Sequence, residues 1–251
     1  VGCSVPAVMA SRALEHKKDR LKTILVTPFM SCSARLPIYV LFSSMFFGKY
    51  AMLACYSMYL LGIVIAILTA YIISKIDGSK AEHALLIELP EYKAPNARTI
   101  AVYVWEKVKD YLTKAGTVIF FASIVMWLLL NVGPSGFVTD ITESFGAVIG
   151  KAIVPFFRPL GLGYWQIVVA LISGIAAKEV VVSSCSVLFG IQNITTAHGM
   201  DSFVATLGAM GFGAANAYAL MVFCLLYVPC TATIATIRRE VGSTKTTAGI
   251  V

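Results

Sequence analysis

The chain has 251 residues, 58% of them hydrophobic and only 13% charged, with a mean hydropathy of +0.82 and a net charge of +7. Soluble domains carry about twice that share of charged residues, so the composition excludes an ordinary soluble domain and indicates an all-α polytopic membrane protein. The basic residues cluster in short stretches between apolar runs, which fits loops at an anionic membrane surface and gives no sign of a nucleic-acid interface.

The first apolar region, residues 24–47, is interrupted by Pro28, Arg35 and Pro37. Prolines and charges at membrane depth are tolerated where a helix is broken and its free backbone groups face a protected cavity. The region therefore predicts a broken helix. Arg35, which lies close to a proline, is expected to cap carbonyl oxygens that the break releases.

An uncharged run follows at 51–74, and at about 1.5 Å per residue it is long enough to cross the roughly 30 Å hydrocarbon core. The polar connector 75–114 carries apolar residues on one helical face, at Ile100, Val104, Val108, Tyr111 and Leu112. This pattern predicts an amphipathic helix that lies on the cytoplasmic membrane surface. A second uncharged run, 115–132, predicts the next transmembrane helix.

The segment 133–163 contains few basic residues and is expected to lie outside, with a short helix near 143–157. The next apolar region, 164–190, has Lys178 and Glu179 at its centre. Because neither flank carries a basic cluster, both of its ends are expected outside. A single span cannot satisfy that condition, so the region predicts a re-entrant hairpin that turns near Lys178 and Glu179.

The last apolar run, 217–237, is interrupted by Pro229. Residues 227–240 resemble residues 26–40, because each stretch places a proline shortly before a cysteine, and the two spans are expected to cross the membrane in opposite directions. Interrupted segments at corresponding positions of two halves indicate an inverted-repeat transporter with its site near the midplane. Three segments rich in lysine and arginine are expected to be cytoplasmic, namely 12–22, 75–114 and 238–245.

Soft side chains lie near these breaks, and they are Cys3, Met30, Cys32 and Cys230. Thiolate and thioether ligands favour Fe²⁺, Cu⁺ or Zn²⁺, and carbonyls freed by proline are further candidate ligands. The alternative is that these residues only pack, as cysteine and methionine often do. Glu179 is a candidate cation-attracting carboxylate with Lys178 as its counter-charge. Alternatively, these two side chains pair at the tip of the hairpin.

Other kinds of site have no support in the sequence. The six cysteines form no CxxC pair, and the three histidines are not spaced as zinc ligands. There is no phosphate-binding loop and no Ser/His/Asp set, so nothing indicates an enzyme active site.

The motifs resemble one known family. Residues 3–42, CSVPAVMASRALEHKKDRLKTILVTPFMSCSARLPIYVLF, resemble the first gate region of the ferrous iron transport protein B family. The second gate region of that family is similar to ISGIAAKEVVVSS followed by FCLLYVPCTATIATIRRE. The strings ELPEYKAPNARTI and KAGTVIF resemble its connecting segments, so the likeness covers essentially the whole chain.

The resemblance implies an inward transporter of Fe²⁺ in the bacterial cytoplasmic (inner) membrane, with Cys3, Cys32 and Cys230 as gate cysteines that coordinate iron. Full-length members carry an amino-terminal GTP-binding domain, which would hold GTP and Mg²⁺, and further helices. We interpret both ends of this chain as lying inside such a protein, and we expect no GTP hydrolysis by this part alone. Ser4 stands where many relatives are expected to have asparagine, which weakens any role for an amide ligand there.

The same resemblance implies three parts. They are a first gate region at 1–48, truncated at its start; transmembrane helices at 49–132 with the connector 75–114; and an outer loop, re-entrant segment and second gate region at 133–251, truncated at its end. The implied partners are Fe²⁺, the lipid bilayer, small cytoplasmic accessory proteins of the same uptake system and further copies of the chain.

Two other functions are alternatives. A nucleoside or other small-solute permease shares the gate architecture, but thiols at the breaks favour a metal, whereas amides and hydroxyls there would favour a nucleoside. A non-transporting membrane assembly subunit is the second alternative, and the charges and prolines inside the spans argue against it.

Overall fold

The computed structural model describes residues 2–14, 16–77, 96–133, 136–138, 143–191 and 196–242, together with positions 247 and 249. This part of the chain is helical except for one pair of two-residue strands. The elements before the strands are α1 (Ser4–Ala10), η1 (Ser11–Ala13), α2 (Lys17–Val26), η2 (Thr27–Phe29), η3 (Ser33–Arg35), α3 (Leu36–Phe47), η4 (Gly48–Tyr50), α4 (Ala51–Asp77) and α5 (Ala97–Asn131). Those that follow are β1 (Val132–Gly133), β2 (Gly136–Phe137), α6 (Phe145–Phe157), η6 (Arg158–Leu160), α7 (Trp165–Ala176), α8 (Val180–Leu188), α9 (Ala197–Ala209), α10 (Ala214–Leu226) and α11 (Thr231–Val241).

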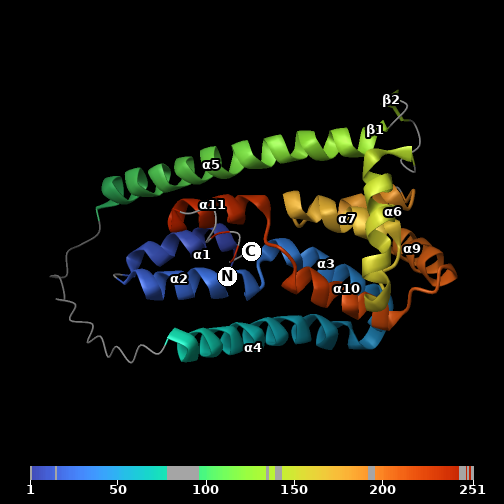
Figure 1. Cartoon of the computed structure of the whole chain (residues 1–251), viewed down its shortest axis with the longest axis horizontal. Helices are drawn as coiled ribbons and strands as arrows, with labels where there is room; N and C mark the ends of the chain where they lie inside the picture. Colours follow the sequence, from blue (N-terminus) through green and yellow to red (C-terminus); the bar gives the residue numbers. More distant parts are fainter. Residues whose placement is uncertain are drawn as a thin grey trace.

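The two long helices α4 and α5 run along opposite sides of the molecule, and the shorter helices lie between them (Figure 1). Helices α1, α2 and α11 occupy one end of this interior, whereas α3, α7 and α10 occupy the other. Helix α6 crosses that second end, and α6 with η6 makes an angle of 101° with α7. The basic segment 12–22 and the basic end of α11, with Arg238 and Arg239, therefore lie toward the same end, as the positive-inside rule predicts for a single cytoplasmic face.

The main core lies where α3, α7, α9 and α10 meet. Phe42, Leu171, Phe203 and Leu220 are buried there, with Phe42 and Phe203 in an edge-to-face contact. By contrast, α4 points large apolar side chains outward along its whole length, and Met52 is 86% exposed. Such a surface suits lipid as its solvent.

Two helical stretches among the described residues, Lys17–Ile76 and Ala214–Val241, are long and apolar enough to cross a membrane. The bent pair of α6 with η6 and α7 makes a third if it forms one broken span. The chain thus has an all-helical membrane fold, and the helix predicted at 51–74 is present as α4, within the first of these stretches.

The breaks predicted from proline and charge are also present. The first apolar region divides into α2 and α3, separated by two short 3₁₀ turns between Thr27 and Arg35. The last apolar region divides near Pro229 into α10 and α11. At about 1.5 Å per residue, none of these four helices is long enough to cross a bilayer alone. Helices α10 and α11 together make up the stretch Ala214–Val241, which is long enough.

The separate surface helix predicted within 75–114 is wrong. Residues 97–131 form one continuous helix, α5, which joins the amphipathic stretch to the predicted span. At about 1.5 Å per residue this helix is about 50 Å long. A change from polar to apolar composition does not end a helix when no proline or capping signal interrupts it. The preceding ELPEYKAP segment lies outside the described residues.

The hairpin predicted at 164–190 is formed by α7 and α8, and the chain turns at 177–179. Ser173 and Ser184 face each other across it, with their hydroxyl oxygens 2.8 Å apart. Gly174 allows this close packing, because a Cβ there would overlap the Val181 side chain and the Tyr227 hydroxyl.

Replacing Gly174 by alanine is expected to destabilise the fold by about 1–3 kcal/mol, because the added carbon overpacks the contact with α8 and Tyr227. Gly208→Ala in α9 is the matched control, since nothing lies within 4 Å of the position that its Cβ would take. That change is expected to be neutral or to stabilise by up to about 1 kcal/mol, because alanine favours helix. Thermal unfolding of the purified protein in detergent measures both, and equal midpoints for the two variants would contradict the close-packing argument.

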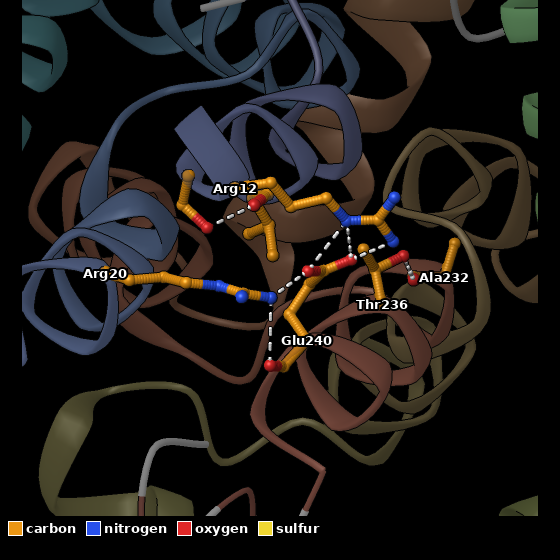
Figure 2. Close-up of polar contacts among 7 residues, drawn as sticks. Arg12, Arg20, Ala232, Thr236 and Glu240 are labelled. Atoms are coloured by element: carbon orange, nitrogen blue, oxygen red, sulfur yellow. Dashed lines mark hydrogen bonds and ion pairs between the residues drawn. The ribbon is translucent and has the colours of Figure 1, made fainter. Parts of the chain in front are cut away.

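A three-residue ionic cluster ties the start of the chain to its last described helix (Figure 2). Arg12 donates from Nε to both carboxylate oxygens of Glu240, at 2.8 and 2.9 Å. Arg20 of α2 donates to the same carboxylate and to the Glu240 main-chain oxygen at 3.0 Å. The Glu240 side chain is only 2% exposed, so its charge depends on these two arginines.

We expect Glu240→Gln to lower the stability by about 1–2 kcal/mol, since charge-assisted hydrogen bonds are lost while the partly exposed arginines keep some contact with water. Glu106→Gln on the exposed part of α5 is the control. Thermal unfolding at low and at high salt is the measurement. A Glu240→Gln midpoint equal to that of the parent at low salt would show that the cluster does not stabilise the fold.

Candidate ion site between the broken helices

Four of the places where helices begin, end or break meet at one cavity of about 200 Å³. Its walls come from the start of α1, the α2–α3 break, the α7–α8 turn and the α10–α11 break. The lining residues are 2–5, 32–35, 176–179, Pro229, Cys230, Ala232 and Thr233. Broken helices leave main-chain groups without helical partners, so carbonyls near this cavity need other hydrogen-bond donors.

Arg35 holds the first break together. Its guanidinium donates from both terminal nitrogens to the carbonyl of Pro28 at 3.1 Å, and from one of them to the carbonyl of Met30 at 3.3 Å. The residue is only 2% exposed. The prediction that Arg35 caps carbonyls released by the break is confirmed.

Lys178 has a corresponding role at the break between α10 and α11. It is 2% exposed, and its ammonium donates to the carbonyl of Cys224 at 3.4 Å and lies 3.8 Å from the centre of the Tyr227 ring. The expected pairing with Glu179 is absent, because no ion pair joins Lys178 to a carboxylate among the described residues. Glu179 is instead exposed and lines the cavity.

The two halves repeat one hydrogen bond. The residue after Cys32 is Ser33, whose hydroxyl and amide both donate to the carbonyl of Gly2, at 2.5 and 3.0 Å. The residue after Cys230 is Thr231, whose hydroxyl donates to the carbonyl of Ala176 at 3.1 Å. In each half, a hydroxyl beside the break cysteine thus binds a carbonyl at another interruption of the chain. This correspondence agrees with the inverted repeat predicted from the sequence.

The cavity brings together four of the five residues predicted as ligands. Cys3, Cys32, Cys230 and Glu179 all line it, whereas Met30 is outside its lining. The thiol of Cys230 lies 3.2 Å from the Thr233 hydroxyl. Of the other cysteines, Cys185 and Cys224 are buried in the main core, and Cys55 packs against that core from α4.

The described histidine, cysteine and acidic side chains include no group of three arranged to hold one metal ion. The thiols therefore line the walls of a common space without forming a closed coordination shell.

The hydroxyl side chains at this site were not predicted from the sequence. Ser33, Thr231 and Thr233 lie close to the break cysteines, and each makes a hydrogen bond at a break. The repeated pairs Cys32–Ser33 and Cys230–Thr231 were a usable signal. The choice of Gly2 and Ala176 as acceptors had no such signal, because it depends on how distant segments pack.

Two family descriptions match the chain. A model described as Gate, nucleoside recognition, matches residues 112–244, which is more than half of the chain. A model described as the ferrous iron transport protein B C terminus matches residues 55–107. No solved structure matches the chain.

Individual relatives agree with these matches. The Fe(2+) transporter FeoB of Methanocaldococcus jannaschii is 43% identical over 249 residues, which cover 96% of this chain and 36% of that protein. FeoB of Staphylococcus aureus (strain COL) is 42% identical over 247 residues, which cover 98% of this chain and 36% of that protein. A Porphyromonas gingivalis protein named as a fusion of Fe(2+) transport protein A and FeoB is 35% identical over 289 residues, covering 97% and 34%.

The chain thus spans about a third of the length of the curated relatives that it matches. Within that third, the likeness runs through both broken-helix regions and through the helices between them. The Gate match contains the α7–α8 turn and the α10–α11 break, which form half of the cavity. On this evidence the chain belongs to the ferrous iron transport protein B family and contains the Gate module.

Proposed function

We propose that this chain is the permeation core of a ferrous iron transporter and that Fe²⁺ passes through the cavity at the four interruptions. The observation that carries the proposal is the convergence of Cys3, Cys32, Cys230 and Glu179 on one cavity of an all-helical membrane fold. Relatives that are named as Fe(2+) transporters support the choice of ion.

The chemistry of the lining supports a cation as the cargo. Thiolates bind borderline-soft transition metals such as Fe²⁺, and a carboxylate adds negative charge. The charges of Arg35 and Lys178 are bound to carbonyls at the breaks, at Pro28, Met30 and Cys224. The three hydrogen bonds of Arg35 hold the two sides of the first break together beside the path. We assign the ligand role to the three cavity thiols and Glu179, and a flanking role to Met30.

The wider setting is part of the same proposal. The protein lies in the cytoplasmic membrane as a multi-pass transporter, and this stretch conducts an ion and is not an enzyme. We further propose that a GTP-binding domain, which would hold GTP and Mg²⁺, works together with this part of the protein. A small accessory protein is a proposed partner, supported by the fusion named in Porphyromonas gingivalis. Assembly of several copies is proposed as well.

A nucleoside permease is the second candidate, because the matching Gate model is described as nucleoside recognition. The lining of the cavity argues against it. Its described residues include no aromatic side chain that could stack on a base, and they include three thiols. Ser4, Ser33 and Thr233 supply hydroxyls, but Ser33 already donates to the Gly2 carbonyl.

The test is uptake into liposomes that contain the purified full-length transporter, under anaerobic conditions. We expect Fe²⁺ to accumulate above the level of protein-free liposomes, and labelled nucleosides not to do so. Mn²⁺ and Zn²⁺ in excess measure the selectivity among divalent ions. Uptake of a nucleoside without uptake of Fe²⁺ would reject the proposal in favour of the second candidate.

A further inference from the structure

Lys178 is a buried cation beside the proposed path of another cation. It lies in the turn between α7 and α8, is 2% exposed and lines the same cavity as the three thiols. A buried ammonium is costly unless it is paired, and among the described residues no carboxylate pairs with it. Its charge is therefore balanced by neutral groups that attract cations.

Those groups are a helix end and an aromatic face. Helix α10 ends at Leu226, so Cys224 is among the residues whose carbonyls lack a helical donor and carry the negative end of the helix dipole. The Lys178 ammonium lies 3.4 Å from this carbonyl and 3.8 Å from the centre of the Tyr227 ring. Carbonyl oxygens and aromatic faces are both favourable neighbours for a cation.

The two buried cations at the cavity differ in how firmly they are held. Arg35 makes three hydrogen bonds to two carbonyls with a rigid planar guanidinium. Lys178 makes one long hydrogen bond and one ring contact, and it has a flexible four-carbon stem. Arg35 bridges two carbonyls, whereas Lys178 binds only one. Lys178 can therefore move away without breaking a bridge between two parts of the chain.

We propose that Lys178 is a tethered cation. Its ammonium is hydrogen-bonded to the carbonyl of Cys224 when the cavity is empty, and it moves away when a divalent metal ion binds. The inference rests on the proposed transport of Fe²⁺ through this cavity. Like charges repel strongly beside a group as buried as Lys178, so the ion and the ammonium at the Cys224 carbonyl exclude each other. Lys178 thus keeps the empty break closed and weakens ion binding, which favours release of the ion.

The first measurement is the Kd for Fe²⁺ of the full-length transporter, obtained by anaerobic competition with a chelating indicator. Lys178→Met removes the charge and keeps most of the stem, and we expect it to lower the Kd about tenfold or more. Lys178→Arg keeps the charge and is expected to bind Fe²⁺ no more tightly than the parent. A merely structural role would predict weaker binding in both variants.

Lys151→Met is the matched control, because Lys151 also lies over an aromatic ring, that of Trp165, at 5.6 Å, but is outside the cavity lining. Its Kd is expected to equal that of the parent. The second measurement needs no substitution at Lys178. The parent protein is treated with an amine-reactive acyl ester with and without Fe²⁺, and modification of Lys178 is quantified by mass spectrometry. Fe²⁺ is expected to increase modification of Lys178 severalfold and to leave Lys151 unchanged.

The outcomes separate the two proposals. Fe²⁺ binding that the thiol substitutions abolish, together with an unchanged Kd in Lys178→Met, overturns the tethered-cation role and leaves the transport proposal standing. If Lys178→Met does not accumulate as folded protein, the labelling decides, and modification of Lys178 that Fe²⁺ leaves unchanged or lowers overturns the inference. A parent protein that neither binds nor transports Fe²⁺ rejects both proposals.

Discussion

Serine at both Cys32 and Cys230 is expected to abolish anaerobic Fe²⁺ uptake by the full-length transporter, with normal amounts of protein in the membrane. Both residues line the cavity, one from each half of the repeat. Replacing a thiolate with a hydroxyl removes the ligand type that favours Fe²⁺ and leaves the size of the side chain nearly unchanged. Each single substitution is expected to lower uptake at least tenfold.

The double variant shows whether the two thiols contact the same ion. If the two thiols contact the same ion, the loss in the double variant is smaller than the product of the two single losses, because the first substitution already removes most of the shared interaction. If they act at separate points of the path, the losses multiply. The geometry, with both thiols on one cavity, favours the first result.

Cys55→Ser provides the matched control. Cys55 is partly buried on α4 and lies outside the lining of the cavity, so uptake is expected to be unchanged. Uptake that remains normal in the Cys32, Cys230 and double variants would show that these cysteines only pack. The ligand role would then pass to Glu179 and to the carbonyls at the breaks.

The breaks were predictable because their causes are local. Proline cannot donate a helical hydrogen bond, and a charge inside an apolar run needs a polar partner, so Pro28, Arg35, Lys178 and Pro229 each marked an interruption. The span at α4 was predictable for an equally local reason, since it is a long run without a charge or proline. These features needed only the chain and the thickness of a bilayer.

Features that depend on distant packing were not predictable from the sequence. Lys178 binds the carbonyl of a residue 46 positions later, and Thr231 binds one 55 positions earlier. The sequence instead suggested that Lys178 pairs with its neighbour Glu179. The continuity of α5 was missed for another reason, because a change of polarity does not end a helix where no residue interrupts its hydrogen bonds.

Arg35→Met is expected to cause the largest loss of stability among these substitutions. The guanidinium is itself buried and caps the carbonyls of Pro28 and Met30, so removing it leaves two partly buried acceptors without this donor. Each unsatisfied buried group costs about 1–3 kcal/mol, so two of them cost up to about 2–6 kcal/mol. That loss is comparable with the whole stability of many proteins, and little folded protein should accumulate in the membrane.

Arg35→Lys separates the loss of hydrogen bonds from the loss of charge, and Arg98→Met is the control for removing an arginine from the surface. Lysine keeps the charge but lacks the planar fork that reaches both carbonyls, so an intermediate loss is expected. Arg98 is exposed at the start of α5, and its replacement should leave stability unchanged. The measurement is the fraction of monodisperse protein that remains in detergent after heating. If Arg35→Met and Arg98→Met are equally stable, the first break is held by packing and Arg35 is free to act as a charge in the path; if only Arg35→Met is lost, the break depends on its hydrogen bonds.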